Sequence, residues 1–280
     1  MLAYRHAFHA GNHADVLKHL VLVQLLRHMA RKDKGIRIVD THAGAGLYAL
    51  DSPQARKKDE YLQGIARLWG ATDTPAAVAE YLELVRGFNA DGTLRCYPGS
   101  PMLAQALMRP QDQLRLFELH PAEQRALQAL LGGHKGVEIL PQDGFAGLRS
   151  QLPPPTRRAL VLIDPSYEGH ADYGRVVQTV GDGLRRFAQG VFMVWYPVVS
   201  KPGAAAMVQG LKALAPGGWL HAWLCVQPTD SLGFGLAGSG VLVINPPHTL
   251  HGQLQLALPW LLRALAQHDG AKQGLEQRAI

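Results

Sequence analysis

Short apolar runs that alternate with helical segments constrain the fold of this chain more than any other feature. Seven such runs predict buried strands, and they lie at residues 36–40, 114–118, 137–140, 159–163, 191–195, 219–224 and 240–244. Alternating strands and helices predict an α/β fold with a mostly parallel, doubly wound sheet. We expect the last two runs to form an antiparallel pair at one edge of that sheet. We also expect the polar tail after about Gln267 to be frayed.

Two helical regions accompany these strands. Residues 14–31 place apolar side chains at helical spacing, which predicts an amphipathic helix. Residues 51–89 also follow a helical pattern and interrupt the succession of strands. We therefore expect an α/β domain made of residues 1–46 and 99–280, with a helical subdomain inserted at residues 47–98.

Composition and charge indicate the setting in which the chain works. It has 280 residues, a net charge of +6 and a pI of about 9.4, and a basic surface favours a polyanionic partner such as nucleic acid. Cys96 and Cys225 are too few for a disulfide framework, which favours a reducing compartment. The N-terminus lacks the apolar core of a signal peptide, and no apolar run is long enough to span a bilayer. We expect a monomeric cytoplasmic protein that makes no membrane contact.

The predicted strands end in residues of distinctive chemistry, and the sheet topology brings these ends to one edge. The first strand runs into Gly44-Ala45-Gly46, whose glycines let the backbone approach a ligand closely. Glu118 ends the second strand and can accept bonds from both hydroxyls of a ribose. Asp143-Gly144 follows the third strand, where the carboxylate can accept from an adenine amine, and Asp164 ends the fourth. Together the four ends predict a pocket for adenosine.

Each of these features has a simpler structural explanation when it is taken alone. The glycines of the first turn, and also Asp143-Gly144, are consistent with ordinary tight turns. Glu118 is consistent with an acid at a helix N-terminus, since Pro121 opens the next helix. Four such ends in the right order favour a ligand pocket over four unrelated turns.

The turn Asp164-Pro165-Ser166-Tyr167 has the most specific chemistry. A carboxylate at the mouth of a buried strand has a desolvation cost unless it is paired or used. Asp164 and the carbonyl of Pro165 can accept the two N–H groups of an adenine N6 amine, while Tyr167 can stack on the ring. Two acceptors at fixed angles pull the nitrogen towards tetrahedral geometry and aim its lone pair at a methyl group on a sulfonium, so no metal is required. The base has to leave its stack first. The alternative is a strand-end turn with a core tyrosine.

A second turn, Asn245-Pro246-Pro247-His248, also follows an apolar strand. It comes last in the chain and lacks an aromatic residue at its end. We therefore interpret it as the exit loop of the edge strand.

Several long motifs of the chain resemble one family, the bacterial 23S ribosomal RNA adenine-N6 methyltransferases called RlmJ. The similarity covers nearly the whole chain, and its motifs lie at residues 4–6, 8–19, 40–46, 97–101, 118–121, 143–145, 164–167 and 195–199. The resemblance implies a class I, Rossmann-like methyltransferase that depends on S-adenosylmethionine. It also implies that the substrate is a single adenine near the peptidyl-transferase centre of 23S ribosomal RNA.

The resemblance also implies roles for individual residues. With Gly44 of the first turn added, the implied cofactor site consists of His19, His42, Gly44, Ser100, Glu118, Asp143, Gly144 and Asp164. Lys18 joins Asp164, Pro165 and Tyr167 as a catalytic residue, and Tyr4 and His6 are implied to lie near the RNA or the target base. The chain departs from the family at Ser166, where the family turn usually has a second proline. Because Pro165 keeps its carbonyl, we expect activity to persist with a looser loop.

Two other kinds of site find less support. His9 and His13 are spaced as metal ligands on a helix, but Gly11-Asn12 interrupts that helix and no third ligand is evident, so we expect no metal. Residues 44–49 match a loose dinucleotide fingerprint. The acidic strand end that a nicotinamide dehydrogenase has about twenty residues later is missing, which argues against that enzyme class.

Other methyl acceptors and a non-enzymatic function stay open at this point. An RNA-binding module without activity would explain the basic charge, but it would not explain Asp164 in an aromatic turn. The turn contacts an amine or an amide alike. An N6-adenine DNA methyltransferase and a protein methyltransferase acting on an amide nitrogen are therefore alternatives to an RNA methyltransferase.

Overall fold

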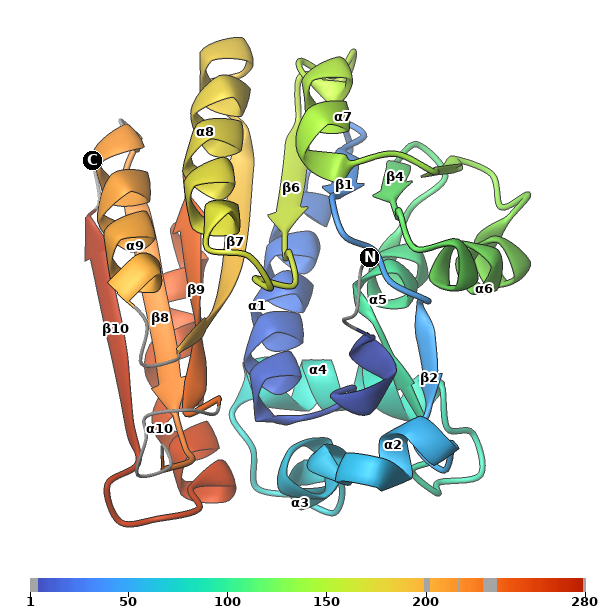
Figure 1. Cartoon of the computed structure of the whole chain (residues 1–280), viewed down its shortest axis with the longest axis vertical. Helices are drawn as coiled ribbons and strands as arrows, with labels where there is room; N and C mark the ends of the chain where they lie inside the picture. Colours follow the sequence, from blue (N-terminus) through green and yellow to red (C-terminus); the bar gives the residue numbers. More distant parts are fainter. Residues whose placement is uncertain (1–4, 199–201, 216, 229–235, 279–280) are drawn as a thin grey trace.

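The computed structural model describes residues 5–198, 202–215, 217–228 and 236–278. These residues form an eight-stranded sheet in the order β10-β8-β9-β7-β6-β1-β4-β5 (Figure 1). Its strands are β1 (Arg37–Asp40), β4 (Gln113–Phe117), β5 (Val137–Leu140), β6 (Ala159–Ile163), β7 (Val191–Val198), β8 (Trp219–Cys225), β9 (Gly238–Ile244) and β10 (Lys272–Arg278). Neighbouring strands are parallel from β5 through β4, β1 and β6 to β7. The predicted Rossmann-like, mostly parallel sheet is confirmed.

Helices cover both faces of the sheet (Figure 1). One face carries α1 (His13–Ala30), α5 (Ser100–Leu107), α6 (Pro121–Leu131) and α10 (Thr249–Leu265), and the other carries α7 (Gly144–Gln151), α8 (Ala171–Arg186) and α9 (Pro202–Leu214). Successive side chains of a strand point to opposite faces. Accordingly, Ile38 of β1 packs into the core on the first face, and Val39 packs into the core on the second.

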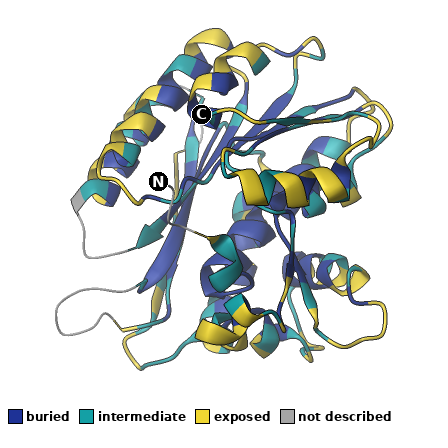
Figure 2. Ribbon diagram, turned by 45° about the vertical axis from the view of Figure 1, so that its right-hand side comes forward, coloured by how far each residue is buried: buried dark blue, intermediate teal, exposed yellow. Residues whose placement is uncertain are grey.

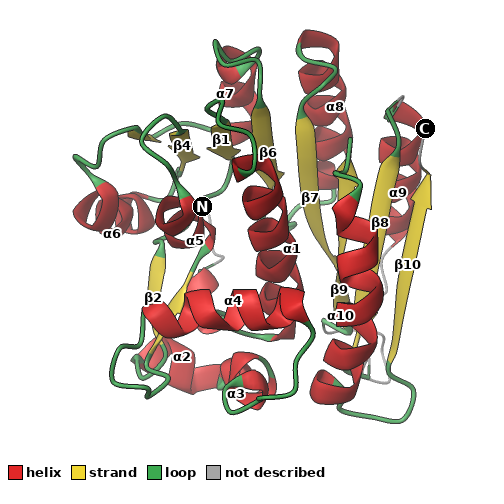
Figure 3. Cartoon of the chain, turned by 180° about the vertical axis from the view of Figure 1, so that it is seen from behind, coloured by secondary structure: helices red, strands yellow, loops and turns green. Residues whose placement is uncertain are grey.

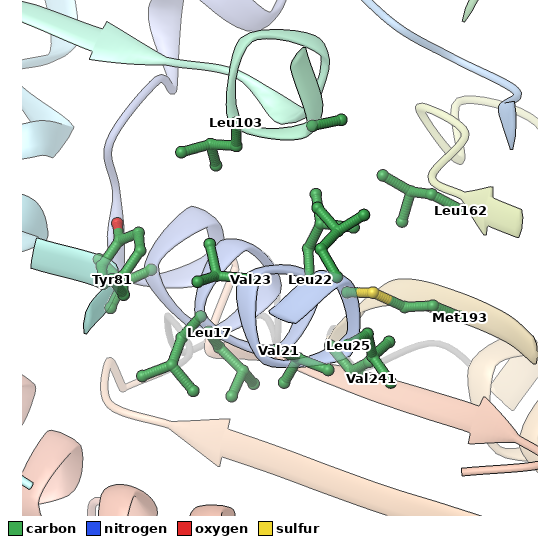
Figure 4. Packing of buried hydrophobic residues seen from close by; sticks show 14 of the residues in the cluster. Leu17, Val21, Leu22, Val23, Leu25, Tyr81, Leu103, Leu162, Met193 and Val241 are labelled. Carbon is green, nitrogen blue, oxygen red and sulfur yellow. The ribbon is translucent and has the colours of Figure 1, made fainter. Parts of the chain in front are cut away.

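Helix α1 is enclosed on all sides, which corrects the prediction of an amphipathic helix. Fifteen of its eighteen residues are buried, and it ends at Ala30. Figure 4 shows its apolar side chains directed towards the sheet, towards Leu103 of α5 and towards Tyr81. Figure 2 shows the contrast with the outer helices, which expose one side. A helix enclosed on every side needs apolar residues in every direction. Apolar residues at helical spacing therefore do not by themselves indicate that the helix has an exposed face.

The start of α1 is polar despite its burial. The Asn12 side chain caps the helix by accepting from the backbone N–H groups of Ala14 and Asp15. Asp15, Lys18 and His19 follow within the first two turns, and all are buried. Buried polar groups require partners, so this end of the helix is the place to look for a site.

Residues 47–98 form the region that we expected to be a helical insertion. It contains β2 (Leu47–Ala49), α2 (Pro53–Lys58), η2 (Glu60–Gln63), α3 (Ile65–Leu68), α4 (Ala76–Gly87) and β3 (Cys96–Pro98). Strands β2 and β3 pair antiparallel, so the region begins and ends on a small two-stranded sheet that the sequence did not predict. The strand β2 follows Gly46 directly, whereas a dinucleotide fingerprint is followed by a helix. Helix α4 runs across α1 (Figure 3).

The C-terminal part of the sheet corrects three further predictions. Strands β8 and β9 do form an antiparallel pair, but β9 also pairs with β7 and therefore lies inside the sheet. The turn at Asn245 consequently leaves an interior strand. The edge is β10, which pairs with β8 along its whole length where we expected a frayed tail. An edge strand with one half-buried face needs few apolar residues, so its sequence resembles that of a polar tail.

Across the residues that the structure describes, the helices are too short or too polar to cross a membrane.

Candidate active site

A cavity of about 570 Å³ opens at the carboxyl ends of β1, β4, β5 and β6. All four predicted strand ends line it, together with the start of α1 and the short helix η1 (His6–Phe8). Its volume falls within the range of small-molecule sites. The cavity brings together the predicted residues His6, Lys18, His19, His42, Gly44, Ser100, Glu118, Asp143, Gly144, Asp164, Pro165 and Tyr167. Tyr4, predicted to lie near the target base, is outside the described residues.

The turn after β1 is held by Glu118 at the end of β4. Gly44 adopts φ +65°, a conformation that favours glycine, and its N–H donates to Glu118 Oε2 at 2.8 Å. The backbone N–H of His120 donates to the other carboxylate oxygen at 2.6 Å. Burial raises the pKa of Glu118. Each carboxylate oxygen still has a lone pair for the hydroxyls of a ribose.

Asp143 and Gly144 form the start of α7. Asp143 Oδ1 caps the helix by accepting from Phe145 N at 2.9 Å, and Oδ2 lies 2.5 Å from the Arg175 guanidinium. Gly144 is required here because a Cβ would lie 2.0 Å from the carbonyl oxygen of Thr41. Because Gly144 has no side chain, the turn after β5 can approach the turn after β1. This close approach closes one side of the cavity.

Asp40, the last residue of β1, is buried beneath the cavity. The Ser100 hydroxyl donates to its Oδ2 at 2.6 Å, and the backbone N–H of His42 donates to Oδ1 at 3.2 Å. Burial raises the pKa of Asp40 to about 6. Since its only hydrogen points to Asp40, the Ser100 hydroxyl can only accept a further bond, so this corner suits a donor such as an amino group.

The two predicted cofactor histidines are held as neutral rings. His42 Nδ1 lies 2.8 Å from the Thr41 hydroxyl, and burial lowers the pKa of His42 to about 4. His19 Nδ1 lies 2.7 Å from the Tyr97 hydroxyl, and burial lowers the pKa of His19 well below its usual value. His19 Nε2 is buried and finds no partner within the described ranges. An unpaired buried nitrogen in a cavity wall suits a ligand hydrogen bond.

Asp164 at the end of β6 belongs to a buried ionic network. The Lys18 ammonium lies 2.7 Å from Asp164 Oδ2 and 2.8 Å from Asp15 Oδ1. Asp15 Oδ2 in turn accepts from the backbone N–H of Gly11 and lies 2.9 Å from His6 Nε2. The network therefore links η1, through α1, to the turn after β6.

The charges of this network stabilise one another. The two carboxylates hold the pKa of Lys18 above its usual value despite the opposing effect of burial. His6 and Lys18 hold the pKa of Asp15 well below its usual value against the same opposing effect. Lys18 therefore stays an ammonium at neutral pH, and it cannot act as a general base.

The rest of the Asp164 turn is firmly packed. Tyr167 adopts φ 53°, its hydroxyl donates to the Trp195 carbonyl at 2.6 Å, and its ring centroid lies 4.8 Å from that of Tyr173. Only 6% of Tyr167 is exposed, so the structure shows a tyrosine that anchors the turn. Stacking of Tyr167 on a base stays a prediction. Pro165 is buried, and Ser166 is half-buried.

The two histidines with metal-like spacing lie in different surroundings. His9 precedes α1, and its Nδ1 lies 2.9 Å from both Glu60 carboxylate oxygens, whereas His13 begins the helix. No cluster of three or more potential metal-ligating side chains occurs in the part of the chain that the structure describes.

Sequence reasoning missed Asp15, Tyr97 and Arg175. Asp15 was recoverable in principle, because it precedes Lys18 by three residues and so lies on the same side of the helix. Tyr97 and Arg175 reach the site through tertiary packing, and their positions in the sequence carry no spacing that would indicate this.

The hydrogen-bonding groups of the cavity fit S-adenosylmethionine. Glu118 provides acceptors for ribose hydroxyls, the Ser100–Asp40 pair provides acceptors for an amino group, and the unpaired His19 nitrogen suits a further polar contact. Glu118, Ser100 and His19 line one cavity of sufficient size.

Comparisons with known proteins agree on a single family. A family model described as "Ribosomal RNA large subunit methyltransferase D, RlmJ" matches residues 33–275. Ribosomal RNA large subunit methyltransferase J of Escherichia coli (strain K12) is 46% identical over 261 residues, which cover 93% of each chain. The protein of that name from Haemophilus influenzae is 44% identical over 266 residues, covering 95% of this chain and 94% of its own.

Solved structures share the fold. A protein from Legionella pneumophila str. Philadelphia 1 matches with a TM-score of 0.87 and 33% identity, covering 96% of this chain and 98% of its own. A probable spermidine synthase from Corynebacterium glutamicum matches with a TM-score of 0.50 and 12% identity, covering 93% and 82%. At that identity the second match shows the fold alone.

Proposed function

The chain belongs to the RlmJ family of ribosomal RNA large subunit methyltransferases, and we propose that it methylates N6 of a single adenine in 23S ribosomal RNA. The family depends on S-adenosylmethionine. The observation that carries the proposal is Asp164, a carboxylate placed at the end of β6 in the wall of the cavity and held there by Lys18.

Asp164 is arranged to accept from an amine. Lys18 occupies its Oδ2, while Oδ1 makes no hydrogen bond within the described part of the chain. In the proposal, Oδ1 accepts one N–H of the adenine amine and the Pro165 carbonyl accepts the other. The two acceptors draw the nitrogen lone pair out of conjugation with the ring and direct it towards the methyl group. A new N–C bond forms as the S–C bond breaks, and the nitrogen then loses one proton.

Lys18 has a positioning and electrostatic role in this scheme. It pairs with the Asp164 carboxylate beside the reacting nitrogen and fixes the direction of that side chain. Because Lys18 stays protonated, the proton that the nitrogen loses leaves through Asp164 or water. Preorganised charges of this kind supply much of the rate enhancement in enzymes.

The remaining predicted residues hold the cofactor in this proposal. S-adenosylmethionine, when bound, supplies the methyl group on a sulfonium. Glu118 binds the ribose hydroxyls, and Asp143 with Gly144 borders the adenine. Ser100, His42, His19 and the Gly44 turn surround the amino-acid end. Tyr4 and His6 contact the RNA, and we propose that the enzyme acts as a monomer in the cytoplasm.

Methyl transfer to protein-free 23S ribosomal RNA tests the proposal directly. The RNA is incubated with labelled S-adenosylmethionine, digested and mapped by mass spectrometry, and a single N6-methyladenosine is expected. Asp164→Asn is the matched control, because it keeps the size of the side chain and should remove turnover. Preferred labelling of DNA, or of a protein amide, would contradict the assignment to RNA. Full turnover in the Asp164→Asn variant would contradict the role of the Asp164 carboxylate, and RNA binding without turnover in the wild-type protein would indicate a binding module.

A further inference from the structure

A chain of three buried side chains connects the inserted region to the cavity. The hydroxyls of Tyr81 on α4 and Tyr97 on β3 lie 2.9 Å apart, and the Tyr97 hydroxyl lies 2.7 Å from Nδ1 of His19 on α1. Both tyrosines are fully buried, and His19 is 1% exposed. Each polar atom of these three side chains must therefore find its partner inside the protein or on a ligand.

The direction of the hydrogen bonds decides which nitrogen of His19 carries the hydrogen. A neutral imidazole has one N–H, on Nδ1 or on Nε2. In one direction, Tyr81 donates to Tyr97 and Tyr97 donates to Nδ1, so the ring hydrogen is on Nε2. In the other direction, Nδ1–H donates to Tyr97, Tyr97 donates to Tyr81, and Tyr81 needs an acceptor.

Tyr81 decides between the two directions. Its hydroxyl has Tyr97 as its one hydrogen-bond partner within the described ranges of the chain. The second direction would therefore leave a fully buried hydroxyl hydrogen without an acceptor, which is unfavourable. The first direction uses both hydroxyl hydrogens and leaves one donor, Nε2–H. That nitrogen is buried and unpaired among the described residues, as a group awaiting a ligand would be.

We propose that Tyr97, at the end of this series of hydroxyls, holds His19 in the Nε2–H tautomer, so that His19 offers an N–H donor to the carboxylate of the cofactor's amino-acid end. This inference rests on the proposed function for the identity of the ligand. In it, the inserted region completes the cofactor site by positioning His19, without touching the cofactor itself.

The order of the strands explains why the amino-acid end is the part that His19 meets. Strand β1 lies between β4 and β6. In the proposed binding mode, the ribose lies at Glu118 of β4 and the methyl group lies near Asp164 of β6. The remaining branch of the cofactor, its amino-acid end, then passes over the end of β1. Ser100 lies there with its hydrogen directed to Asp40, so its hydroxyl can accept from an amine, and His19 on the neighbouring helix supplies the donor that a carboxylate requires.

The tautomer of His19 is measurable without any reaction. Long-range ¹H–¹⁵N correlation spectra of protein labelled with ¹⁵N-histidine separate protonated from unprotonated ring nitrogens. The signals of His19 are assigned by their loss in His19→Asn. We expect Nε2 protonated and Nδ1 unprotonated in the wild-type protein. A protonated Nδ1 would overturn the inference, whatever the enzyme methylates.

Two matched variants then test the role of the tyrosines. Tyr97→Phe removes the hydroxyl that bonds to His19, and Tyr81→Phe removes an equally buried hydroxyl one step away. We expect Tyr97→Phe to release the tautomer and to weaken binding of S-adenosylhomocysteine about tenfold. Tyr81→Phe should keep the tautomer and change the same affinity by less than about threefold. Equal losses in both variants would indicate general packing and overturn the inference.

A truncated ligand identifies the group that His19 contacts. 5′-Methylthioadenosine keeps the nucleoside and the sulfur but lacks the amino-acid end. Titration calorimetry should show that Tyr97→Phe leaves its affinity unchanged, while the affinity for S-adenosylhomocysteine falls. Equal weakening of both ligands would overturn the carboxylate as the partner. Neither measurement uses RNA, so failure of the inference is distinct from failure of the proposed substrate.

Discussion

Lys18 and His19 are consecutive residues of α1, yet they connect the cavity to different parts of the protein. Lys18 does so through charges, and His19 does so through hydrogen bonds between neutral groups. Lys18 is charged and lies between two carboxylates, in a network that reaches η1. His19 is neutral and ends a chain of hydroxyls that reaches the inserted region. Both are buried, so each needs partners, but a buried charge needs counter-charges whereas a neutral ring needs only hydrogen bonds in a fixed direction.

The comparison indicates a division of tasks. In the proposed function, the charged side faces the reacting nitrogen, and it is coupled to the N-terminal segment. In the same proposal, the neutral side faces the cofactor, where a donor of fixed direction is needed, and it is coupled to residues 47–98. Removing a charge should therefore have larger effects than removing a hydroxyl.

Lys18→Met is expected to have the largest effect. It leaves Asp15 and Asp164 without their shared counter-charge, and breaking a buried ion pair in this way costs about 3–5 kcal/mol of unfolding free energy. Turnover should fall by roughly 10²–10³-fold, because Asp164 loses the partner that fixes its direction. Urea unfolding and methyl-transfer rates measure the two effects.

Lys212→Met is the matched control for that change. Lys212 forms an ion pair with Glu276 that is largely exposed on the Glu276 side, far along the sheet on α9 and β10. Its loss should cost less than about 1 kcal/mol and leave turnover unchanged. Similar losses of unfolding free energy and turnover in the two lysine variants would mean that the Lys18 network contributes no more than a surface ion pair does.

Asp15→Asn is expected to have an intermediate effect. It keeps the size of the side chain but removes one of the two charges that hold Lys18, so turnover should fall about tenfold. The pKa of Asp15 is lowered in the folded protein, so its stabilising contribution is fully present above its unfolded pKa of about 4. The contribution is lost as the pH falls below that value.

The difference in unfolding free energy between wild type and Asp15→Asn should therefore be constant from about pH 5 to pH 8, and it should shrink towards pH 3. Denaturant titrations across this range measure it. A difference that stays constant down to pH 3 would show that the charge of Asp15 does not stabilise the fold.

Ser166→Pro is expected to have the smallest effect. The acceptor carbonyl belongs to Pro165, so a second proline changes the stiffness of the turn and not its chemistry. The unfolding free energy should rise by roughly 0.4–1 kcal/mol through the unfolded chain, with turnover within about twofold of wild type. A large loss of turnover would show that this chain needs the freedom that Ser166 gives the turn.

The sequence was informative wherever the position of a residue follows from the sheet. Glu118, Asp143 and Asp164 end or follow parallel strands, and such ends meet at one edge, so their convergence in the cavity was predictable. The motifs around Lys18, His19 and Ser100 indicated a site only by resemblance, since a lysine or a histidine on a helix has no spacing that reveals its partners.

The sequence was misleading where the surroundings of an element decide its pattern. Helix α1 appeared amphipathic because its polar residues include Lys18, His19 and Gln24, yet these are buried as well. Strand β10 appeared to be a loose tail because its pairing with β8 uses backbone groups and only one half-buried face. Tyr81 falls within the expected helical insertion and Tyr97 within a motif of the family resemblance, and only the tertiary contacts reveal that their hydroxyls connect to His19.

The complete enclosure of α1 also bears on how this family can change over evolutionary time. A helix with a solvent-facing side tolerates neutral substitutions there, and such positions let a lineage drift. Here fourteen consecutive residues, from His13 to Leu26, are buried against the sheet, the neighbouring helices or the cavity. Substitutions in this window meet either packed side chains or the site, so the helix that holds Lys18 and His19 has little freedom to diverge.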